Sequence, residues 1–307
     1  MKAAVLGATG FIGRTLLPEL AREHDVVAVS RSGAELADVR VKSVSGDVTD
    51  HAAMRRALDG VDVVYYLVHS LGASDFSERD KRAAATVATE AERAGVSQIV
   101  YLGGLGDDRS DLSPHLRSRA ETAATLEEGA VPVTTLRAAM VVGRGSAGFE
   151  TIVALVDRLP VMIAPKWVSM PTQPIALTDV IAYLAGVAGH DAAIGETFDL
   201  GGPDVLTYRE MIERIAALRG RRRAIVEVPI LSPRLSSYWL HLVTPVRASV
   251  ARPLVEGLRN PTVVRDNRIR QLLPQELTTF DAAARVALGQ VYASSSPTWS
   301  TSSKSGG

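Results

Sequence analysis

Short runs of β-branched and aliphatic residues alternate with longer alanine-rich stretches through the first half of the chain. The apolar runs predict buried strands, which in chain order are AAVLG, VVAVS, VKSVS, VDVVYYL, SQIVYLGG and PVTTLRA. Helices are expected between them, notably over Phe11–Glu23, Asp75–Ala94 and Leu112–Glu128. Strands that alternate with helices at this spacing indicate βαβ units, and near-continuous apolar strands are typical of a parallel sheet covered on both faces. The pattern therefore predicts an α/β fold built on a doubly wound parallel sheet.

The alternation changes after about Gly143, where prolines cluster in LPVMIAPKWVSMPTQPI and predict loops with short extended pieces. TDVIAYLAGVA is expected to be a helix with Thr178 or Asp179 as its N-cap. ETFDLGG predicts a strand, and LTYREMIERIAALRG predicts an amphipathic helix that ends at Gly220. The stretch LSSYWLHLVTPVRASVARPLVEGL predicts a broken pair of helices.

These changes divide the chain into three parts. We expect the sheet domain over residues 1–145, and a smaller C-terminal α/β lobe, partly interleaved with the sheet, over residues 146–290. The serine- and glycine-rich tail over residues 293–307 has a composition that predicts disorder.

Composition narrows the functional class. The 307 residues are 46% hydrophobic and carry no formal net charge, so a sizeable core is expected and general nucleic-acid binding is not. The absence of cysteine excludes disulfides, thiolate catalysis and thiolate metal sites, and no metal is expected. The first apolar run is too short for a signal peptide, and no stretch approaches the roughly 18 apolar residues of a membrane span. We therefore expect a soluble, cytoplasmic protein.

A glycine-rich turn joins the first expected strand to the first expected helix. In VLGATGFIGRTLL the glycines follow the pattern G-x-x-G-x-x-G at positions 7, 10 and 13. Such a turn lets backbone amides approach a pyrophosphate, and the helix that follows contributes its positive amino end. This context predicts a dinucleotide site, against the alternative of a glycine turn without a ligand. The residues expected to bind the cofactor here are Gly7, Thr9, Gly10, Phe11, Ile12 and Gly13.

The end of the second strand, VAVSRSG, bears on the choice of cofactor. Sites that prefer NAD place an acidic residue here to bind the ribose 2′-hydroxyl, whereas this chain has Ser30, Arg31 and Ser32. Because a guanidinium matches phosphate oxygens in a bidentate contact, Arg31 and Ser32 predict NADP(H) in preference to NAD(H). The alternative is that Arg31 stacks on the adenine.

Two later strand ends complete the expected nucleotide site. In SGDVTD, Asp47 and the Val48 backbone are placed to meet the adenine amino edge, although Asp47 could instead cap a helix, a role that Asp50 could also fill. His69 by itself indicates neither catalysis nor metal binding. In YYLVHS the residues expected to line the nucleotide channel through their backbone are Leu67, Val68 and His69.

Together these stretches resemble the extended and atypical branches of the short-chain dehydrogenase/reductase superfamily. GATGFIG, SGDVTD, LRAAMVVG, PIALTDVIAYL and FDLGGPDVLTYREM fall in the order of that family's motifs. YYLVHSLG, YLGGLG, LSPHLRSRAE, GFE and HLVTPV resemble an atypical NAD(P)-binding group within it, and the resemblance covers residues 1–285. It implies an NAD(P)-binding Rossmann domain over residues 1–145. Related members include epimerase/dehydratase-like proteins, NmrA-like redox-sensing regulators and a complex I accessory subunit, so the fold can also hold a nucleotide without turnover.

The resemblance also locates the expected chemistry. Working enzymes of the superfamily use a serine after the fifth strand and a Tyr-x-x-x-Lys pair, in which the tyrosine exchanges a proton with the substrate oxygen. Here the serine position is occupied by Gly103 or Gly104, and the pair reads His115-x-x-x-Arg119. We therefore expect Gly103 and Arg119 to contact the cofactor, with His115 and Arg119 as the catalytic candidates.

His115 and Arg119 lie on one helical face at this spacing. A neighbouring guanidinium lowers the pKa of an imidazole, so a neutral His115 could act as a base in an oxidation or polarise a carbonyl. Arg119 could hold the nicotinamide ribose or an anionic substrate. The alternative is that both residues only grip the ribose or cap the pocket. Ser113 before a proline is expected to cap the helix, and Tyr101 is expected in the core.

The substrate side is expected to be apolar, against the alternative of ordinary packing within the lobe. The residues expected to line it are Gly104, Met140, Phe149, Trp167 and Met170. They favour a small apolar carbonyl or quinone-like substrate. An NADP(H)-dependent oxidoreductase with a non-standard site is therefore one hypothesis, and a non-catalytic redox sensor or accessory factor of a larger complex is the other.

The C-terminal lobe is basic. From Arg219 to Arg270 there are eleven arginines and three acidic residues, an excess of eight (11 − 3). RGRRRAIVEV favours a solvated or salt-bridged face over a nucleic-acid site. Residues 234–247 join aromatic and aliphatic side chains to arginines, and could form a lid, a subunit interface in a homo-oligomer, a protein contact or a peripheral membrane contact.

Overall fold

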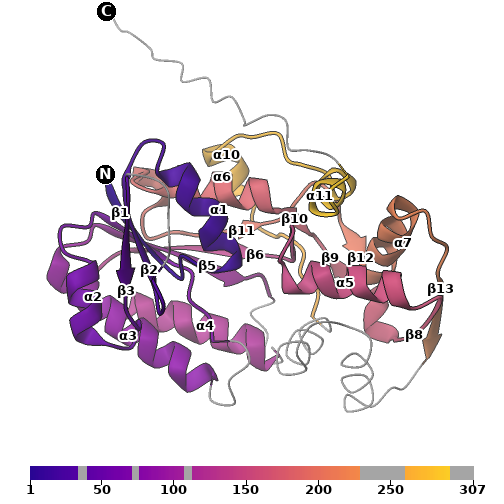
Figure 1. Cartoon of the computed structure of the whole chain (residues 1–307), viewed down its shortest axis with the longest axis horizontal. Helices are drawn as coiled ribbons and strands as arrows, with labels where there is room; N and C mark the ends of the chain where they lie inside the picture. The colour runs from indigo at the N-terminus through magenta and orange to yellow at the C-terminus, as the bar shows by residue number, and fades with distance from the viewer. Residues whose placement is uncertain (34–39, 71–75, 107–112, 229–259, 291–307) are drawn as a thin grey trace, which may run out of the picture.

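Seven parallel strands form the central sheet, which we describe from a computed structural model (Figure 1). The structure describes residues 1–33, 40–70, 76–106, 113–228 and 260–290. The strands follow the order β11, β6, β5, β4, β1, β2, β3, and every neighbouring pair is parallel. Their bounds are β1 Lys2–Leu6, β2 Asp25–Ser30, β3 Val41–Ser45, β4 Val63–Tyr66, β5 Gln98–Gly104, β6 Val133–Ala138 and β11 Thr197–Leu200. The predicted α/β fold with a parallel sheet is confirmed.

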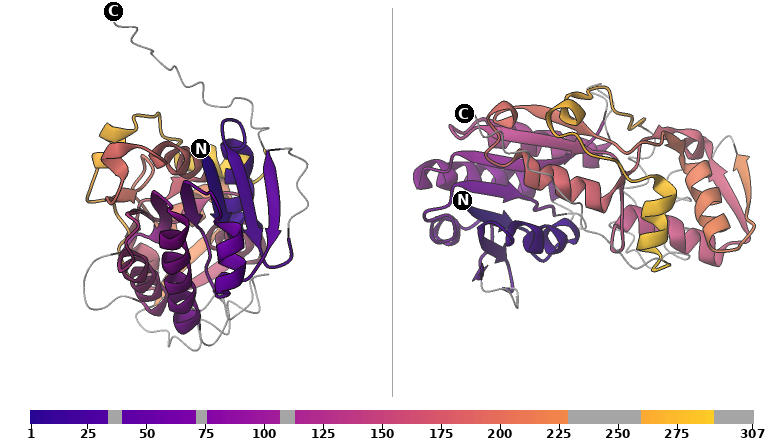
Figure 2. Two further views of the ribbon diagram at one scale, coloured as in Figure 1. Left: turned by 90° about the vertical axis from the view of Figure 1, so that its left-hand side faces the viewer. Right: turned by 90° about the horizontal axis from the view of Figure 1, so that it is seen from above.

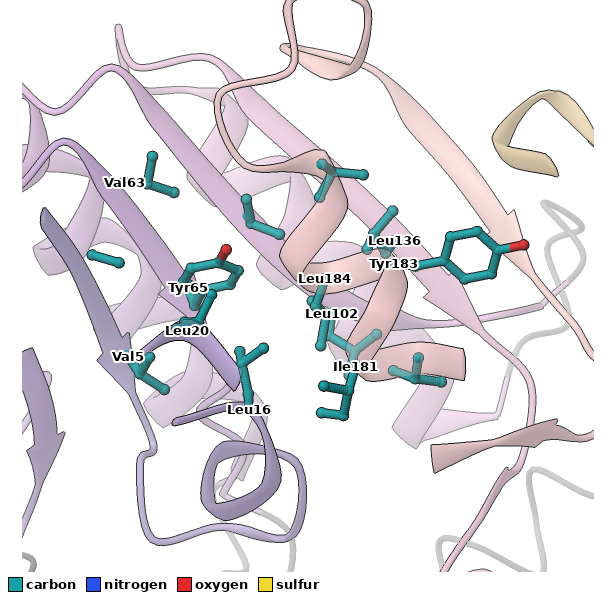
Figure 3. Close-up of a cluster of buried hydrophobic side chains, with 14 of the residues drawn as sticks. Val5, Leu16, Leu20, Val63, Tyr65, Leu102, Leu136, Ile181, Tyr183 and Leu184 are labelled. Carbon is teal, nitrogen blue, oxygen red and sulfur yellow. The ribbon is translucent and has the colours of Figure 1, made fainter. Parts of the chain in front are cut away.

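Helices cover both faces of this sheet (Figure 2). One face carries α1 Phe11–Leu20 and α6 Leu177–Val187, and the other carries α2 His51–Ala57, α3 Phe76–Ala94 and α4 Pro114–Glu127. Because successive strand residues point to opposite faces, Tyr65 packs with α1 and α6 whereas Tyr66 packs with α2, α3 and α4. Figure 3 shows the first of these cores, in which Leu16 of α1 and Ile181 of α6 belong to the same cluster as Tyr65.

The third strand departs from the expectation of a buried strand. Within the described sheet β3 pairs with β2 alone and forms an edge, and Lys42, Ser43 and Ser45 are exposed. An edge strand has a neighbour on one side only, so its side chains stay in contact with water. The prediction that VKSVS is buried was therefore wrong, because burial depends on the order of the strands in the sheet.

The second half of the chain builds a smaller lobe with a core of its own. The elements of this half are β7 Val141–Val142, α5 Ala147–Arg158, β8 Val161–Pro165, the 3₁₀ helices Lys166–Ser169 and Asp191–Ala193, β9 Pro171–Thr172, β10 Ile175–Ala176, β12 Leu206–Thr207, α7 Tyr208–Leu218, β13 Ala224–Val228, α10 Arg268–Leu272 and α11 Phe280–Ala287. The chain also returns to the first domain, because β11 pairs with β6 and α6 contacts α1. The two parts of the chain are thus interleaved.

Helix α7 has the ends that its sequence predicts. At its start Thr207 Oγ1 accepts from the Glu210 amide, and the Glu210 carboxylate accepts from the Thr207 amide, which forms a capping box. Just after its end Gly220 has a φ of +63°, in the left-handed region that glycine adopts without strain. The predicted termination at Gly220 is confirmed.

Helix α6 corrects a second expectation. Neither Thr178 nor Asp179 is its N-cap, because the helix begins at Leu177 and Ala176 occupies the cap position. Asp179 instead accepts hydrogen bonds from the amide and the hydroxyl of Thr278, each at 2.8 Å. The carboxylate therefore holds the segment before α11 against α6, a contact between residues 99 positions apart.

The arginines after α7 are held by groups of the lobe itself. Arg219 and Arg221 pair with Asp157, and Arg223 donates to the Val156 carbonyl at 2.6 Å. These contacts are those of a salt-bridged face, in line with the interpretation of RGRRRAIVEV.

Several expectations fall on other parts of the chain. Segment 234–247, the whole of the expected helix pair and the tail 293–307 lie outside the described residues. Every helix that the structure describes is too short or too polar to span a lipid bilayer. In the same described ranges, no three histidine, aspartate or glutamate side chains come together as a metal site would require.

Candidate functional site

A cavity of about 390 Å³ opens at the carboxyl ends of β1, β2 and β4. The strand order reverses at this point, because β1 lies between β4 and β2, and doubly wound sheets bind their ligands at such a switch. Of the residues expected to bind the cofactor, its wall contains Gly7, Thr9, Gly10, Arg31, Asp47, Val48, Leu67, Val68 and His69. The wall also contains Ser30, which the sequence named beside Arg31, and five residues that the sequence had not singled out for this site, which are Val29, Gly46, Ser70, Arg79 and Ala83.

The glycine turn forms one end of this cavity. Gly7 has a φ of +88°, and a Cβ atom there would lie 3.1 Å from the Leu67 carbonyl. A Cβ atom on Gly13 would lie 2.8 Å from the Ala8 carbonyl oxygen and still closer to that of Gly7. Glycine is therefore required at Gly7 for the turn and at Gly13 for the close contact of helix and turn.

The features of this end fit a dinucleotide. Helix α1 begins after Gly10 with no side-chain cap and no acidic residue in its first turn, so its amino end keeps its partial positive charge. The amides of Phe11, Ile12 and Gly13 belong to that end, although these residues are not in the cavity wall. The Ser30 hydroxyl in the wall is buried without a hydrogen-bond partner among the described residues, as expected for a group that a ligand satisfies.

Charged side chains gather where the adenosine half would lie. Asp47 accepts from the amide and hydroxyl of Thr49 at 3.0 and 2.8 Å and pairs with Arg79 at 3.0 Å. The pKa of the Asp47 carboxyl is lowered, chiefly by the hydrogen bond from the Thr49 amide and further by the charges of Arg79 and Arg31. Asp50 caps α2, accepting from the Ala52 and Ala53 amides.

The two residues expected to read the 2′-phosphate differ in position. Arg31 is exposed and lies in the cavity wall. Ser32 is exposed but lies outside that wall, and its hydroxyl donates to the Gly33 carbonyl at 3.3 Å. The geometry thus leaves Arg31 as the cation at the end of β2.

A hydrogen-bonded row of three side chains lies beside the cavity, and we call it the His–Asp–His chain. It consists of His69 after β4, Asp80 on α3 and His115 on α4. His69 Nδ1 lies 2.9 Å from Asp80 Oδ2, and His69 Nε2 lies 3.2 Å from His115 Nδ1. The other oxygen of Asp80 accepts from the Ser70 amide at 2.9 Å. His69 thereby joins His115 to the wall of the nucleotide cavity.

Burial controls the charge of this chain. Asp80 is 1% exposed and His115 is 9% exposed. Burial first, and then the Arg119 guanidinium, lowers the pKa of His69 to about 4 and that of His115 to about 2. Burial also raises the pKa of Asp80, but the hydrogen bonds from His69 and Ser70 leave it below its ordinary value. Near neutral pH the two imidazoles are therefore neutral and the carboxyl is ionised.

Arg119 borders a second, smaller cavity of about 60 Å³, together with Gly103 and Gly104. Its Nη1 donates to the Leu102 carbonyl at 3.0 Å, and its own carbonyl accepts from the Tyr101 hydroxyl at 3.1 Å. The structure therefore brings these three expected residues together, but outside the wall of the larger cavity. Tyr101 lies in the core, as expected, at 3% exposure.

Gly103 and Gly104, which stand where the family resemblance implies a serine, are closely surrounded. A Cβ atom on Gly103 would lie 3.2 Å from the Tyr101 ring, and one on Gly104 would lie 3.0 Å from Leu116 and 3.2 Å from Arg119. These distances are tighter than ordinary contacts, so a serine here would displace its neighbours. A side chain at either position would therefore need small shifts of Tyr101, Leu116 or Arg119.

Of the residues expected on the substrate side, Gly104 ends β5 and the others follow β6 in the second half of the chain. Phe149 is 1% exposed within the lobe core, and Met140 packs against that core. Met170 is half-buried between the 3₁₀ helix and β9, and the Trp167 side chain lies outside the described part of the structure. The three described side chains are in the wall of neither cavity.

The sequence analysis did not identify Arg79 or Asp80 as site residues, although the position of Asp80 on an otherwise apolar helix face could have indicated it. The buried face of α3 includes positions 80, 83, 84, 87, 88 and 91, a helical repeat of alanine and valine that begins with an aspartate. A carboxylate on the apolar face of an amphipathic helix needs a partner. That partner, His69, lies after the preceding strand.

The sequence of this chain is similar to those of known proteins. Residues 7–154 match the family model described as NAD(P)H-binding. The chain is 24% identical over 303 residues to the mitochondrial NADH dehydrogenase (ubiquinone) 1 alpha subcomplex subunit 9 of Arabidopsis thaliana, covering 91% of this chain and 75% of the relative. It is 28% identical over 241 residues to the (4-alkanoyl-5-oxo-2,5-dihydrofuran-3-yl)methyl phosphate reductase of Streptomyces griseus, covering 75% of this chain and 78% of the relative.

Solved structures share the fold. The NADPH-dependent quinone oxidoreductase of Escherichia coli, in complex with NADPH, superposes with a TM-score of 0.72 at 21% identity. The match covers 94% of this chain and 99% of the other.

Proposed function

Because residues 7–154 match the NAD(P)H-binding family model and a reductase is among the relatives, we propose that the chain is an NADP(H)-dependent oxidoreductase of the atypical short-chain dehydrogenase/reductase superfamily. Its substrate is a small apolar carbonyl or quinone-like compound. The observation that carries the proposal is the contact of His115 with His69, a wall residue of the nucleotide cavity. A titratable group thus stands next to the nucleotide cavity, at the position where the resemblance to working short-chain dehydrogenases implies a tyrosine.

The chemistry divides between cofactor and chain. A bound nicotinamide supplies the hydride, and the chain supplies the proton or removes it. His115 Nε2 has no hydrogen-bond partner among the described residues, whereas Nδ1 is held by His69. An imidazole in this state can donate or accept a proton within hydrogen-bond reach of a substrate oxygen. Burial, and after it the charge of Arg119, lowers the pKa of His115 and keeps the ring neutral.

The preference for NADP(H) rests on Arg31. Its position in the cavity wall at the end of β2 is the one at which a 2′-phosphate would be recognised. Because a hydrogen bond to a charged group contributes about 1.5–3 kcal/mol, Arg31→Ala is expected to weaken NADPH binding ~10- to 100-fold and to leave NADH binding within a few-fold. Isothermal titration measures both, with the exposed Arg56 of α2, changed to alanine, as the control. Equal weakening of NADPH and NADH would contradict the assignment.

The oxidoreductase itself is tested by stopped-flow oxidation of bound NADPH across a panel of carbonyls and quinones. A substrate is expected to oxidise the cofactor in the wild type, with kcat about 100- to 10,000-fold lower in His115→Ala, the range for loss of a general acid. Unchanged cofactor binding in the variant separates a lost proton donor from a lost fold. Absence of oxidation with every compound would remove the proposal.

A non-catalytic role is the second candidate. The similarity to a respiratory-complex subunit extends over 91% of this chain, and Gly103 and Gly104 stand where the resemblance to working short-chain dehydrogenases implies a serine. In that role the chain holds the nucleotide as a sensor or as an accessory factor of a larger complex. NADPH binding without turnover, together with a co-purifying partner, would favour it.

A further inference from the structure

The reaction chemistry outlined above assigns no proton transfer to His69 or Asp80, although both side chains are largely buried and fully hydrogen-bonded beside His115. Asp80 is a buried carboxylate whose two oxygens are both used, Oδ1 by the Ser70 amide and Oδ2 by His69. The side chain of His69 is only 13% exposed and has both ring nitrogens occupied. A buried carboxylate is costly unless it is hydrogen-bonded, and this one is bonded to the residue that contacts His115.

The hydrogen bonds determine where the protons sit. An ionised carboxylate can only accept, so Nδ1 of His69 carries a proton and Nε2 of neutral His69 carries a lone pair. That lone pair faces Nδ1 of His115, which must therefore carry a proton. His115 Nε2 is then left with its lone pair. The order of protons along the chain is thus decided at its buried end, by Asp80.

We propose that the His–Asp–His chain is a proton relay, in which His69 is the proton store of His115 and Asp80 sets the direction. This rests on the proposed function, since it names the proton source for that reaction. His115 is the catalytic residue that meets the substrate, and His69 and Asp80 are positioning residues that act through it. The relay takes the place of the tyrosine–lysine pair.

Each turnover of the relay takes up one proton from water and delivers one proton to the substrate. In the charged state His69 holds protons on both nitrogens, and His115 holds one on Nε2 and accepts at Nδ1. When a hydride reaches the substrate carbon, His115 Nε2 gives its proton to the substrate oxygen. His69 Nε2 passes its proton to His115 Nδ1, so one proton has left the pair and both rings are neutral. Uptake of one proton from water restores the charged state.

The surrounding charges favour this division of roles. The groups that face the two rings are Asp80 from α3 and Arg119 from α4, with the Tyr66 and Tyr101 phenols near Asp80. Asp80 raises the pKa of His69 toward its ordinary value, whereas Arg119 lowers the pKa of both rings. The positive charge of a protonated pair is therefore stabilised on His69, away from the substrate.

The relay makes a prediction that needs no substrate. Asp80→Asn keeps the shape of the side chain, but the Ser70 amide requires its oxygen, so the new amide NH₂ must face His69 Nδ1. His69 would then accept at Nδ1 and carry its proton on Nε2, and His115 would be driven to carry its proton on Nε2 too. Long-range ¹H–¹⁵N spectra of histidine-labelled protein, assigned with His69→Gln and His115→Gln, report both tautomers. The expected result is inversion of both rings in Asp80→Asn.

Asp50→Asn is the matched control, because it keeps an N-cap on α2 at a distance from the relay and is expected to leave both tautomers unchanged. If His115 keeps its tautomer when His69 inverts, or if neither changes in folded Asp80→Asn, the relay is wrong. Should that variant fail to fold, the wild type decides, since the relay requires the proton on Nδ1 in both rings at neutral pH. A proton on Nε2 of His115 in that state would overturn it.

Kinetics separate the relay from the proposed function. If the NADPH oxidation assay finds a substrate, His69→Gln is expected to lower kcat about 10- to 100-fold with KM within twofold. Asp80→Asn, which removes the charge that stabilises protonated His69, is expected to move the fall of kcat with rising pH to lower pH. Turnover that needs His115 but ignores both changes would refute the relay and leave the oxidoreductase standing. Inverted tautomers without any turnover would confirm the order of protons that Asp80 imposes on the two rings, but would remove the oxidoreductase and, with it, the relay's role as proton source.

Discussion

Arg79 of α3 donates to Asp47 at the end of β3 across a distance of 3.0 Å, and both side chains lie in the wall of the nucleotide cavity. The pair joins an edge of the sheet to the helix that also carries Asp80. It also neutralises an acidic residue next to the place where an anionic cofactor would bind. Arg31 adds its charge to the same carboxylate, so two guanidinium groups surround Asp47.

Arg79→Ala is expected to weaken NADPH and NADH binding by the same factor, about 3- to 10-fold. The half-exposed pair contributes little by itself, but its loss leaves Asp47 without its ion-pair partner at the adenosine end of the cavity, which both nucleotides would share. Isothermal titration with both nucleotides checks this, and the double change Arg79→Ala with Asp47→Asn is expected to recover part of the loss. A selective effect on NADPH would instead make Arg79 the residue that reads the 2′-phosphate.

Gly13→Ala is expected to abolish nucleotide binding and to lower the free energy of unfolding by about 1–3 kcal/mol, the usual cost of overpacking. The added methyl group would meet the carbonyl oxygens of Gly7 and Ala8, which are backbone atoms that cannot turn aside. Urea unfolding and NADPH titration measure the two effects. Gly148→Ala on α5 is the control, because its nearest contacts are ordinary ones at 3.4 Å to Met140. It should be neutral or stabilising, since alanine favours a helix.

Glu90 predicts a loss of stability in acid. This buried carboxylate accepts from Arg55, His51 and Arg93, and the hydrogen bonds from Arg55 and His51 lower its pKa from an ordinary 4.5 to about 2. A pKa lowered by folding stabilises the protein above about pH 4.5, and that contribution disappears as the pH falls toward 2.

The free energy of unfolding should therefore fall more steeply between these pH values in the wild type than in Glu90→Gln. Urea unfolding at a series of pH values tests this, with exposed Glu92→Gln on the same helix as control. Parallel curves for wild type and Glu90→Gln would contradict the prediction.

The lowered pKa values of His69 and His115 predict a second pH range, above that of Glu90, in which the free energy of unfolding falls with acid. Their pKa values of about 4 and about 2 lie below the ordinary 6.5, so the unfolded chain takes up protons that the folded chain refuses. Stability then falls as the pH drops from 6.5 toward 4, by up to about 1.4 kcal/mol per pH unit for each histidine. In His115→Gln the slope of unfolding free energy against pH in this range should be smaller than in the wild type. His24→Gln serves as the control, and an unchanged slope in His115→Gln would show that the ring is protonated without cost.

Features that depend on neighbouring residues were predicted correctly from the sequence, whereas features that depend on residues far apart in the chain were not. The six strands of the first half, the glycine turn and the Gly220 terminus were predicted correctly as elements, because apolar runs and glycine conformations are local properties. The N-cap of α6 was missed because Asp179 is used by Thr278, 99 residues away. The burial of β3 was predicted wrongly because the sequence of a strand does not show whether the strand lies at the centre or the edge of the sheet.

The same division applies to the candidate site. Sequence alone determined that a G-x-x-G-x-x-G turn follows the first strand, and the resemblance to the short-chain dehydrogenases led to the expectation that His115 and Arg119 stand at the positions of the tyrosine and lysine. Only the tertiary structure decided that His115 meets His69, that Asp80 holds His69, and that Arg119 donates to Leu102 beside a separate small cavity. The physical reason is that periodicity and turn geometry act between near neighbours in the chain, whereas hydrogen bonds between residues 11 and 46 positions apart exist only once β4, α3 and α4 have packed together.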